Sequence, residues 1–253
     1  MSLVKKGFAE FIGTFTLVFI SCGVAAASGG SLVATALAFG LSLIAMAYSI
    51  GRISGCHINP AVSLGVFVKD KLNKTPSDEA FGVKDLLVYI CAQILGGFVG
   101  AVLIFGIAKM GNLTLKGDAC NYALGSGANA VDYLTAGPIF GALIIELVLT
   151  FLFVYVILNV TSKKFAAPKM AGLIIGLTLT VVHLLGINFT GTSVNPAKSI
   201  ATALAAWIFN GTTNAISQIW IFIVAPLLGG VLAAVVYHFL HQDDIENKAE
   251  IKK

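Results

Sequence analysis

The sequence predicts an all-helical membrane protein with six transmembrane helices and two short re-entrant helices, arranged as an inverted repeat. Three observations lead to this prediction. The composition is strongly apolar, six apolar runs are long enough to cross a bilayer, and the tripeptide Asn-Pro-Ala occurs twice at matching places in the chain. A re-entrant helix here means one that enters the membrane and ends inside it.

The composition excludes an ordinary soluble protein. Of the 253 residues, 57% are hydrophobic and 11% are charged, and the mean hydropathy is +0.92. Soluble domains carry about 25% charged residues. A soluble fold cannot cover so much apolar surface with so few charges, which excludes a cytosolic enzyme, a nucleic-acid-binding protein and a disordered chain. The net charge of +4 comes from a few short clusters and does not indicate a nucleic-acid partner.

Six apolar runs predict the membrane spans, because a spanning helix needs about 20 apolar residues. The runs are separated by Gly-rich turns or by charged clusters, which we expect to be solvated loops. The predicted spans are residues 8–28, 32–50, 86–108, 138–160, 170–188 and 216–239.

The distribution of Lys and Arg predicts that both chain ends are cytoplasmic. With the N-terminus inside, 13 of these residues fall on the inner side and 3 on the outer side, as the positive-inside rule requires. An alternative is that the first run, which follows Lys5 and Lys6, is a secretory signal peptide. Glu10 in the run and the second span immediately after it argue against this alternative. We therefore expect a multi-pass protein of the cell membrane.

An internal repeat divides the chain into two related halves. Residues 10–15 recur in similar form as residues 146–151, 136 positions later. The tripeptide Asn59, Pro60 and Ala61 recurs at the same distance as Asn195, Pro196 and Ala197. Each half holds three spans, and because three is odd the second half must be inverted relative to the first. We expect one domain over residues 1–253, with repeats at about 7–109 and 138–240 and a cytoplasmic tail at 241–253.

Each tripeptide is predicted to begin a short helix, since Asn is a favoured N-cap and Pro is favoured at the first helical position. Residues 61–68 cover only about 12 Å at 1.5 Å per residue. The hydrocarbon core is about 30 Å thick, so this helix must be re-entrant. By the inversion, residues 197–209 enter from the opposite side, and the two Asn-Pro starts meet near the bilayer midplane.

The residues before each tripeptide are predicted to be non-helical at membrane depth, which is tolerated only around an aqueous cavity or inside protein. The sequence therefore predicts a pore in which backbone carbonyls accept hydrogen bonds. Two helix N-termini, each with about half a positive charge, would repel cations there. Each Asn would cap its helix and turn its NH₂ to the lumen. The predicted carbonyl-lining residues are Gly55, Cys56, His57, Ile58, Gly191, Ser193 and Val194.

At these residues the chain resembles the aquaporin, or major intrinsic protein, family. The resemblance covers about residues 7–240 and includes residues 9–15, 54–62 and 191–197. It implies a bundle of six helices and two half-helices, a pore in each protomer, and a homotetramer in the lipid bilayer. The implied function is a passive channel for water that excludes ions and protons. No catalysis, metal or cofactor is implied.

The resemblance also implies an outer constriction formed by Phe39, His183, Thr192 and Lys198. A Phe facing a His leaves a narrow, polar opening, suited to water and too tight for glycerol. Ser199 directly after Lys198 is also typical of water channels rather than glycerol channels.

Lys198 is the main departure from the family, which almost always has Arg at this position. Lys keeps the positive charge but offers three donors on a flexible chain, whereas Arg offers five on a rigid plane. Two interpretations stay open: a tolerated exchange, or a change in gating or selectivity. Because the flexible ammonium can turn outward, the constriction is expected to be looser and more variable than with Arg.

Glu10 and Glu146 are carboxylates predicted to lie inside the membrane, where a charge is costly and usually functional. The resemblance favours a structural role, as acceptors for backbone N–H groups of the half-helix loops. The four cysteines, Cys22, Cys56, Cys91 and Cys120, show no metal-binding spacing and imply no disulfide framework.

Three alternative functions are less consistent with the sequence. A glycerol or small-solute facilitator of the same fold is disfavoured by Phe39 and His183. A secondary transporter would need ionisable coupling groups at the midplane, and the candidates are Glu10 and Glu146. A junction protein would need an adhesive outer loop, and residues 110–136 are short and weakly charged.

Overall fold

The computed structural model describes residues 1–76, 80–111, 136–162, 165–211 and 213–242. These residues contain six helices long and apolar enough to cross a membrane, which confirms the six predicted spans. No strand occurs among the described residues. Cys120, the connection at 112–135 and the tail at 243–253 lie outside them.

The helical elements follow the predicted order, with boundaries that differ by a few residues. The first span begins at Leu3 instead of residue 8, because the helix continues through Lys5 and Lys6 at the molecular surface. The elements are α1 (Leu3–Leu17), η1 (Val18–Cys22), α2 (Gly23–Ala27), α3 (Leu32–Ser54), α4 (Pro60–Leu72), α5 (Val83–Met110), α6 (Ala136–Val160), η3 (Pro168–Met170), α7 (Ala171–Thr190), α8 (Pro196–Asn210), α9 (Asn214–Ser217) and α10 (Ile219–Leu240).

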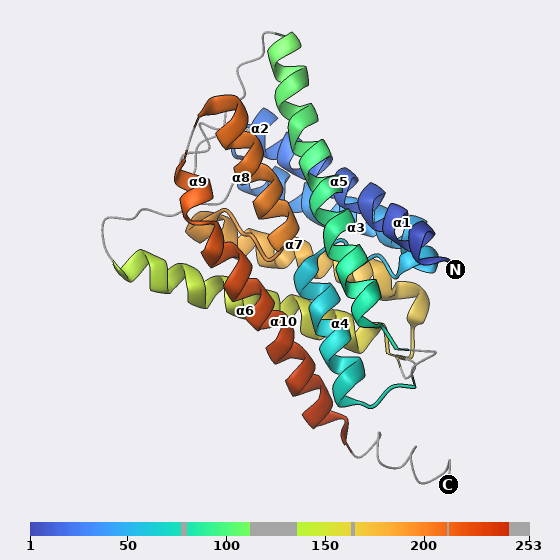
Figure 1. The fold of residues 1–253 in the computed structure, drawn as a ribbon. Helices are drawn as coiled ribbons and strands as arrows, with labels where there is room; N and C mark the ends of the chain where they lie inside the picture. Colours follow the sequence, from blue (N-terminus) through green and yellow to red (C-terminus); the bar gives the residue numbers. More distant parts are fainter. Residues whose placement is uncertain (77–79, 112–135, 163–164, 212, 243–253) are drawn as a thin grey trace, which may run out of the picture.

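Two short helices begin at the tripeptides, and they run in opposite directions from the middle of the molecule (Figure 1). Helix α4 has 13 residues and is longer than predicted, because it continues through Lys69, Asp70 and Lys71. At 1.5 Å per residue it still covers only about 20 Å. Helix α8 has 15 residues. Neither can cross about 30 Å of hydrocarbon.

Helices pack both within each half and between the two halves, and the short helix of each half packs on a long helix of the other. Helix α1 packs on α5, and α6 packs on α10 in the corresponding way. Each short helix packs on the last long helix of the opposite half, α4 on α10 and α8 on α5. Helices α3 and α7, which occupy equivalent places, pack on each other. The two halves therefore interlock instead of lying side by side as separate units.

Glycines let the equivalent helices approach closely in both halves. A Cβ atom on Gly229 of α10 would lie 2.5 Å from the carbonyl oxygen of Leu147 in α6, and Gly96 of α5 faces the carbonyl of Phe11 in α1 in the same way. Phe11 and Leu147 are 136 positions apart. Backbone contact of this kind is how helices associate in a membrane, where burial of apolar surface gives no driving force.

The two halves also approach each other closely between α3 and α7. A Cβ on Gly40 would lie 2.6 Å from the carbonyl oxygen of Gly176, and a Cβ on Gly176 would lie 2.6 Å from that of Gly40. This reciprocal contact leaves no space for a side chain. It keeps α3 and α7 close, and both helices contribute residues to the cavity described below.

We predict that Gly176→Ala destabilises the protein, because the added methyl must push α3 and α7 apart. Overpacking of this kind costs about 1–3 kcal/mol. Gly106→Ala on α5 is the matched control, since a Cβ there meets no atom of the described residues within 4 Å. Thermal unfolding in detergent should give a lower midpoint for Gly176→Ala and an almost unchanged one for Gly106→Ala. Equal midpoints for the two variants would contradict the close α3–α7 contact.

Candidate pore

Two loops with the same backbone conformation lead into the short helices. In the first, Gly55, Cys56 and Ile58 have φ of 88°, 54° and 40°. In the second, the residues 136 positions later have φ of 73°, 50° and 44°; they are Gly191, Thr192 and Val194. Positive φ is unfavourable for β-branched side chains. The loops are therefore strained at Ile58, Thr192 and Val194, and surrounding contacts must hold them in place.

Two buried carboxylates hold these loops. The Glu10 carboxylate accepts hydrogen bonds from the backbone N–H of His57 at 2.9 Å and of Ile58 at 2.6 Å. The Glu146 carboxylate accepts from Ser193 at 2.7 Å and Val194 at 2.8 Å. Both side chains are fully buried. Because every one of these N–H groups precedes a short helix, the carboxylates fix the direction in which each loop enters that helix.

The two tripeptide Asn residues cap their own helices and also bond across to the opposite loop. The Asn59 Oδ1 accepts from the N–H of Ala61 at 2.9 Å, and the Asn195 Oδ1 accepts from Ala197 at 3.1 Å. The Asn59 Nδ2 donates to the carbonyl of Val194 at 2.7 Å, and the Asn195 Nδ2 donates to the carbonyl of Ile58 at 2.9 Å. The sequence analysis did not predict this reciprocal pair. It uses one hydrogen of each NH₂ and leaves the other for the lumen.

A narrow cavity runs past both Asn residues. Its polar lining comes from both loops and from α7, and its remaining wall is apolar. The polar and loop residues are His57, Ile58, Asn59, His183, Ser193, Val194 and Asn195, and the apolar ones are Leu17, Phe39, Leu43, Phe153 and Leu179. The predicted pore residues that do not border this cavity are Gly55, Cys56, Pro60, Ala61, Gly191, Thr192, Pro196, Ala197 and Lys198.

Four predicted constriction residues converge at one end of the cavity. The rings of Phe39 and His183 stack with centroids 4.1 Å apart and an interplanar angle of 21°. The Lys198 Nζ lies 5.6 Å from the centroid of the Phe39 ring and donates to the carbonyl of Thr192 at 3.1 Å. All four residues are buried. They come from α3, α7, the second loop and α8, so the constriction depends on the packing of four segments.

The geometry of this constriction differs from the expectation in two ways. An opening was expected between Phe39 and His183, and instead their ring faces are in contact, which buries both apolar surfaces. The ammonium of Lys198, which can turn outward on its flexible chain, does not do so. It is 1% exposed and points to the Thr192 carbonyl, because that carbonyl and the Phe39 ring face attract a cation.

Two polar atoms at the constriction are buried and have no partner in the part of the chain that the structure describes. The Nδ1 of His183 lies 2.9 Å from the carbonyl of Leu179. A carbonyl only accepts, so Nδ1 carries the hydrogen and Nε2 is a bare acceptor. Among the described residues, that Nε2 and the Thr192 Oγ1 have no hydrogen-bond partner. Buried polar atoms normally have one, so these two atoms mark positions where a small polar molecule can bind.

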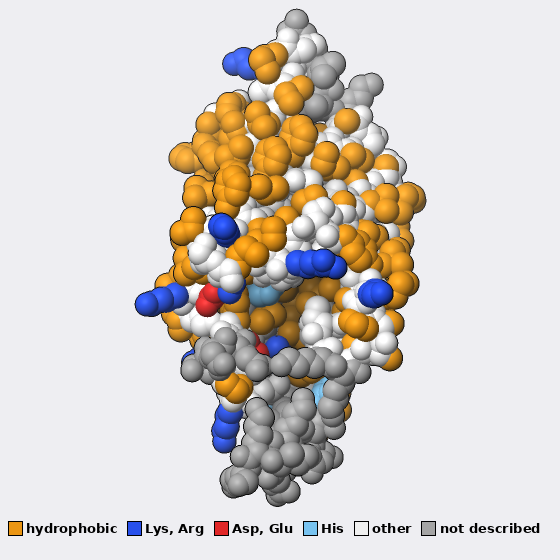
Figure 2. Space-filling model, turned by 90° about the vertical axis from the view of Figure 1, so that its right-hand side faces the viewer, with side chains coloured by type: hydrophobic (Ala, Val, Ile, Leu, Met, Phe, Trp, Pro, Cys, Tyr) orange, Lys and Arg blue, Asp and Glu red, His pale blue; other side chains and the backbone are white. Residues whose placement is uncertain are grey.

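At the opposite end, His57 lies among aromatic side chains. Its ring centroid is 4.9 Å from that of Phe81 and 5.1 Å from that of Tyr89. Figure 2 shows one face of the molecule with a hollow that contains a histidine side chain and has Lys or Arg side chains near its edge. His57 is half-buried, in contrast to His183. We call this end of the cavity the His57 end, and the other the Lys198 end.

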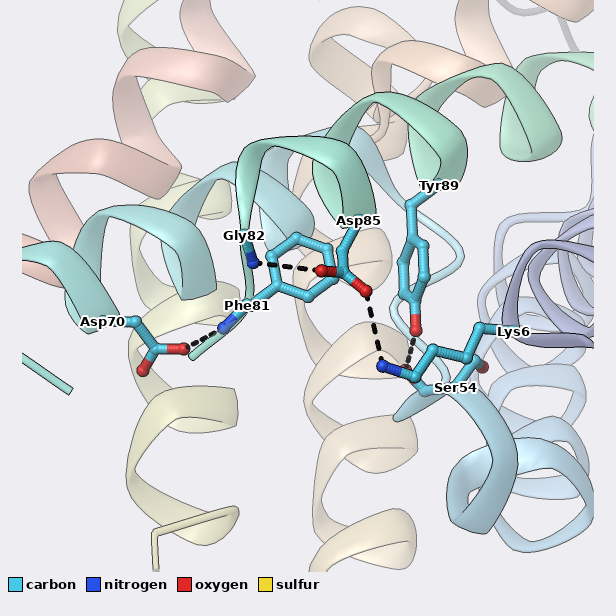
Figure 3. A network of polar contacts seen from close by, with 7 residues as sticks. All are labelled: Lys6, Ser54, Asp70, Phe81, Gly82, Asp85 and Tyr89. Atoms are coloured by element: carbon cyan, nitrogen blue, oxygen red, sulfur yellow. Dashed lines mark hydrogen bonds and ion pairs between the residues drawn. The ribbon is translucent and has the colours of Figure 1, made fainter. Parts of the chain in front are cut away.

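Hydrogen bonds hold the aromatic residues at the His57 end (Figure 3). The backbone N–H of Phe81 donates to the Asp70 carboxylate at 2.9 Å, and the Tyr89 hydroxyl donates to the carbonyl of Ser54 at 2.6 Å. Asp85 caps the start of α5 by accepting from the N–H of Gly82, and it pairs with Lys6 at 3.3 Å. These contacts tie residues 81–82 to α4, α5 and α1.

The sequence analysis missed two buried residues near His57. Gln93 in α5 donates to the Glu10 carboxylate at 2.8 Å and to the Ser63 hydroxyl at 3.1 Å. The available signal was the isolation of Gln93 in the span at 86–108, since an isolated polar side chain in a membrane span usually has a specific partner. Ser63 follows Asn59 by four residues, one helical turn, and gave no comparable signal.

No metal site is present among the described residues, because no group of three or more His, Cys, Asp or Glu lies close enough together. Cys22, Cys56 and Cys91 are free thiols. What remains at the centre is an uncharged, narrow cavity with single donors and acceptors, between the N-termini of two helices.

Together the fold and the cavity define a membrane-spanning channel. The family model for the major intrinsic proteins matches residues 1–237. The chain belongs to this family, whose aquaporins are channels and not enzymes.

Similar proteins cover almost the whole chain. Aquaporin Z of Rhodopseudomonas palustris is 43% identical over 246 residues, with 93% of each chain covered. Aquaporin Z of Brucella melitensis is 40% identical over 243 residues, covering 93% of this chain and 97% of the relative. The solved aquaglyceroporin of Plasmodium falciparum superposes with a TM-score of 0.77 at 24% identity, covering 97% of this chain and 99% of that one. At that identity the structure supports the fold alone.

We predict that Glu146→Gln weakens the second loop, because the amide NH₂ would face N–H donors that the carboxylate now satisfies. Hydrogen bonds to a charged group contribute about 1.5–3 kcal/mol each, so the midpoint of thermal unfolding in detergent should fall by several degrees. Thr178→Ala on α7 is the control, because it removes only a bond from the Thr178 hydroxyl to the carbonyl of Ile174. A Glu146→Gln midpoint equal to that of the control would contradict the structural role of Glu146.

Proposed function

We propose that this chain is a passive water channel that excludes ions and protons. The observation that supports it most is the pair of Asn59 and Asn195 at the facing N-termini of α4 and α8, on the wall of one narrow cavity. Each amide retains one N–H for the oxygen of a passing water. The relatives named Aquaporin Z favour the same function.

Water movement needs hydrogen bonds that replace those of bulk water without holding the molecule. Single polar groups separated by apolar wall lie along the path. The Asn amides and the His183 ring border the cavity, and the Thr192 Oγ1 lies beside it at the Lys198 end. The rest of the wall includes apolar residues such as Leu17 and Phe153, whose side chains offer no hydrogen bond to water. A water molecule therefore exchanges one partner for the next along the path.

Exclusion of cations follows from fixed positive charge. The N-termini of α4 and α8 meet at the cavity, and each carries about half a positive charge. The Lys198 ammonium adds a further positive charge at one end. A cation entering the cavity would lose its hydration shell against this field, and few acceptors would replace the shell. The same field opposes an excess proton.

We assign the pore roles as follows. The tripeptides place the Asn donors, Glu10 and Glu146 hold the loops, and Phe39, His183, Thr192 and Lys198 form the selectivity constriction. A glycerol facilitator is the second candidate. The contact between the Phe39 and His183 rings disfavours it, because an opening wide enough for a carbon chain would require the rings to separate by more than water needs.

We further propose that both chain ends are cytoplasmic, that the cell membrane is the site of action, and that four chains assemble into a homotetramer with one pore in each. The excess of Lys and Arg on the side of the termini supports this orientation. The His57 end is then the cytoplasmic mouth and the Lys198 end is the outer mouth. The two halves of the single domain are inverted repeats.

The purified protein in liposomes should conduct water with a low activation energy, close to that of free diffusion. The reason is that the Asn amides and the constriction replace bulk hydrogen bonds along the path. Light scattering after a sucrose shock, repeated at several temperatures, measures both rate and activation energy, with protein-free liposomes as the control. A temperature dependence as steep as that of the protein-free liposomes would contradict the proposal.

The constriction is tested by His183→Ala, which removes the ring that stacks on Phe39. Glycerol permeability should rise at least several-fold over the wild type, since the remaining opening is wider. His241→Ala is a matched control, because the His241 Nδ1 contacts the carbonyl of Tyr237, four residues earlier, as His183 contacts Leu179. Equal glycerol uptake in both variants would show that His183 does not limit the pore.

Lys198→Arg distinguishes the two interpretations of the unusual Lys. If the ammonium is a tolerated exchange, water flux stays within a few-fold and glycerol and urea leak no less than before. If the Lys relaxes selectivity, Lys198→Arg reduces solute leak in the same vesicles, because a guanidinium makes more bonds to nearby carbonyls. The buried ammonium, bonded to Thr192, supports the first outcome as our expectation.

A further inference from the structure

We propose that Gln93 and Ser63 are positioning residues that fix the side chain of His57 as a hydrogen-bond donor to the lumen. Its consequence for permeation rests on the proposed water-channel function. The hydrogen-bond chain that carries it runs from Glu10 through Gln93 and Ser63 to His57.

This series of hydrogen bonds begins at the Glu10 carboxylate, which can only accept hydrogen bonds. The Glu10 carboxylate receives the N–H groups of His57 and Ile58, and its Oε2 also lies 2.8 Å from the Gln93 Nε2. A Gln carbonyl oxygen in that place would face a carboxylate oxygen, so the amide must present its NH₂. The second hydrogen of that NH₂ points to the Ser63 Oγ at 3.1 Å. The Ser63 oxygen is therefore an acceptor.

The Ser63 hydroxyl must donate its own hydrogen to another acceptor. Its hydroxyl carries one hydrogen, and the Nδ1 of His57 lies 3.1 Å from the Oγ. Among the described residues, the hydroxyl has no other acceptor to which it could donate. Glu10, Gln93 and Ser63 are all fully buried, and an unsatisfied hydrogen is costly in such a place. The hydroxyl therefore donates to Nδ1, which makes Nδ1 bare and places the ring hydrogen on Nε2.

The ring of His57 is also held in its plane. Phe81 packs on it with centroids 4.9 Å apart and Tyr89 at 5.1 Å, and the two aromatic residues pack on each other. Both are anchored by hydrogen bonds, Phe81 to Asp70 and Tyr89 to Ser54 (Figure 3). With Nδ1 engaged by Ser63, Nε2–H is the polar group that His57 offers to the cavity it lines.

The second half of the chain lacks this series of hydrogen bonds to a histidine. The positions equivalent to His57 and Ser63 are Ser193 and Ser199, whose hydroxyl oxygens lie 2.6 Å apart. The Glu146 carboxylate receives the Thr190 hydroxyl at 2.6 Å, and α10 has no counterpart of Gln93 at this point. Ser199 therefore provides a control in which the same hydroxyl is removed from the other half of the same pore.

The two imidazoles of the cavity then have opposite roles. His57 donates through Nε2–H at one end, while His183 accepts through a bare Nε2 at the other, because its hydrogen is on Nδ1. A water molecule can satisfy both groups. A permeant that only accepts hydrogen bonds finds a partner at His57 and none at the His183 Nε2.

The test is nitrogen NMR on the ¹⁵N-histidine-labelled protein in lipid bilayers. The His57 signals are assigned by their loss in His57→Asn, and a directly bonded hydrogen is detected by one-bond coupling. We expect the hydrogen of His57 on Nε2 and that of His183 on Nδ1. A His57 hydrogen on Nδ1 in the wild type overturns the proposal, and that outcome needs no variant that could fail to fold.

Variants test the roles of the positioning residues. Ser63→Ala should convert the single His57 form into a mixture of both tautomers, Ser63→Thr should restore the single form, and Ser199→Ala should leave it unchanged. Water permeability should fall several-fold in Ser63→Ala relative to Ser199→Ala. A His57 spectrum unaffected by Ser63→Ala, or a shifted tautomer with unchanged permeability, overturns the proposal. Wild-type liposomes that conduct no water would refute the channel function instead, because the spectrum reports the tautomer without transport.

Discussion

The pore depends on two carboxylates that are buried to hold backbone in a strained form. Glu10 and Glu146 each accept two consecutive backbone N–H groups from a loop with β-branched residues at positive φ. A charge inside a membrane is expensive, and so is left-handed backbone at Ile58 or Val194. The same hydrogen bonds offset both costs, because the N–H groups that the loop conformation exposes stabilise the charge and the charge holds the loop.

Symmetry explains most of the fold, and departures from it explain the chemistry. The loops, caps, carboxylates and glycine contacts occur in both halves at equivalent positions. Apart from the two Asn residues, the polar side chains that meet the lumen differ between the halves. His57 faces it in one half and Ser193 in the other, and the cation of Lys198 has Val62 as its counterpart. A symmetric scaffold thus carries a pore whose two ends differ in charge and in hydrogen-bonding character.

Much of this arrangement could be predicted from the sequence. Run length and charge predicted the six spans, and the paired tripeptides predicted the short helices. Contacts between segments far apart in the chain could not be predicted. The reciprocal bonds of Asn59 and Asn195, the Phe39–His183 stack and the partner of Lys198 depend on distances set by helix packing. Gln93 was missed because a single amide in an apolar run reveals its partner only after α5 is placed beside α1 and α4.

The crossed bonds between the two tripeptides constrain how such a pore could have arisen. Each Asn side chain donates to a backbone carbonyl of the opposite half. In one half alone, both the Asn NH₂ and the loop carbonyl would lack this hydrogen bond. A half-length ancestor could form these hydrogen bonds only with a second copy inserted in the opposite orientation in the same bilayer. Such a protein would have to be produced in both orientations. Joining the copies in one chain removes that requirement, and it allows each copy to acquire its own lumen-facing residues.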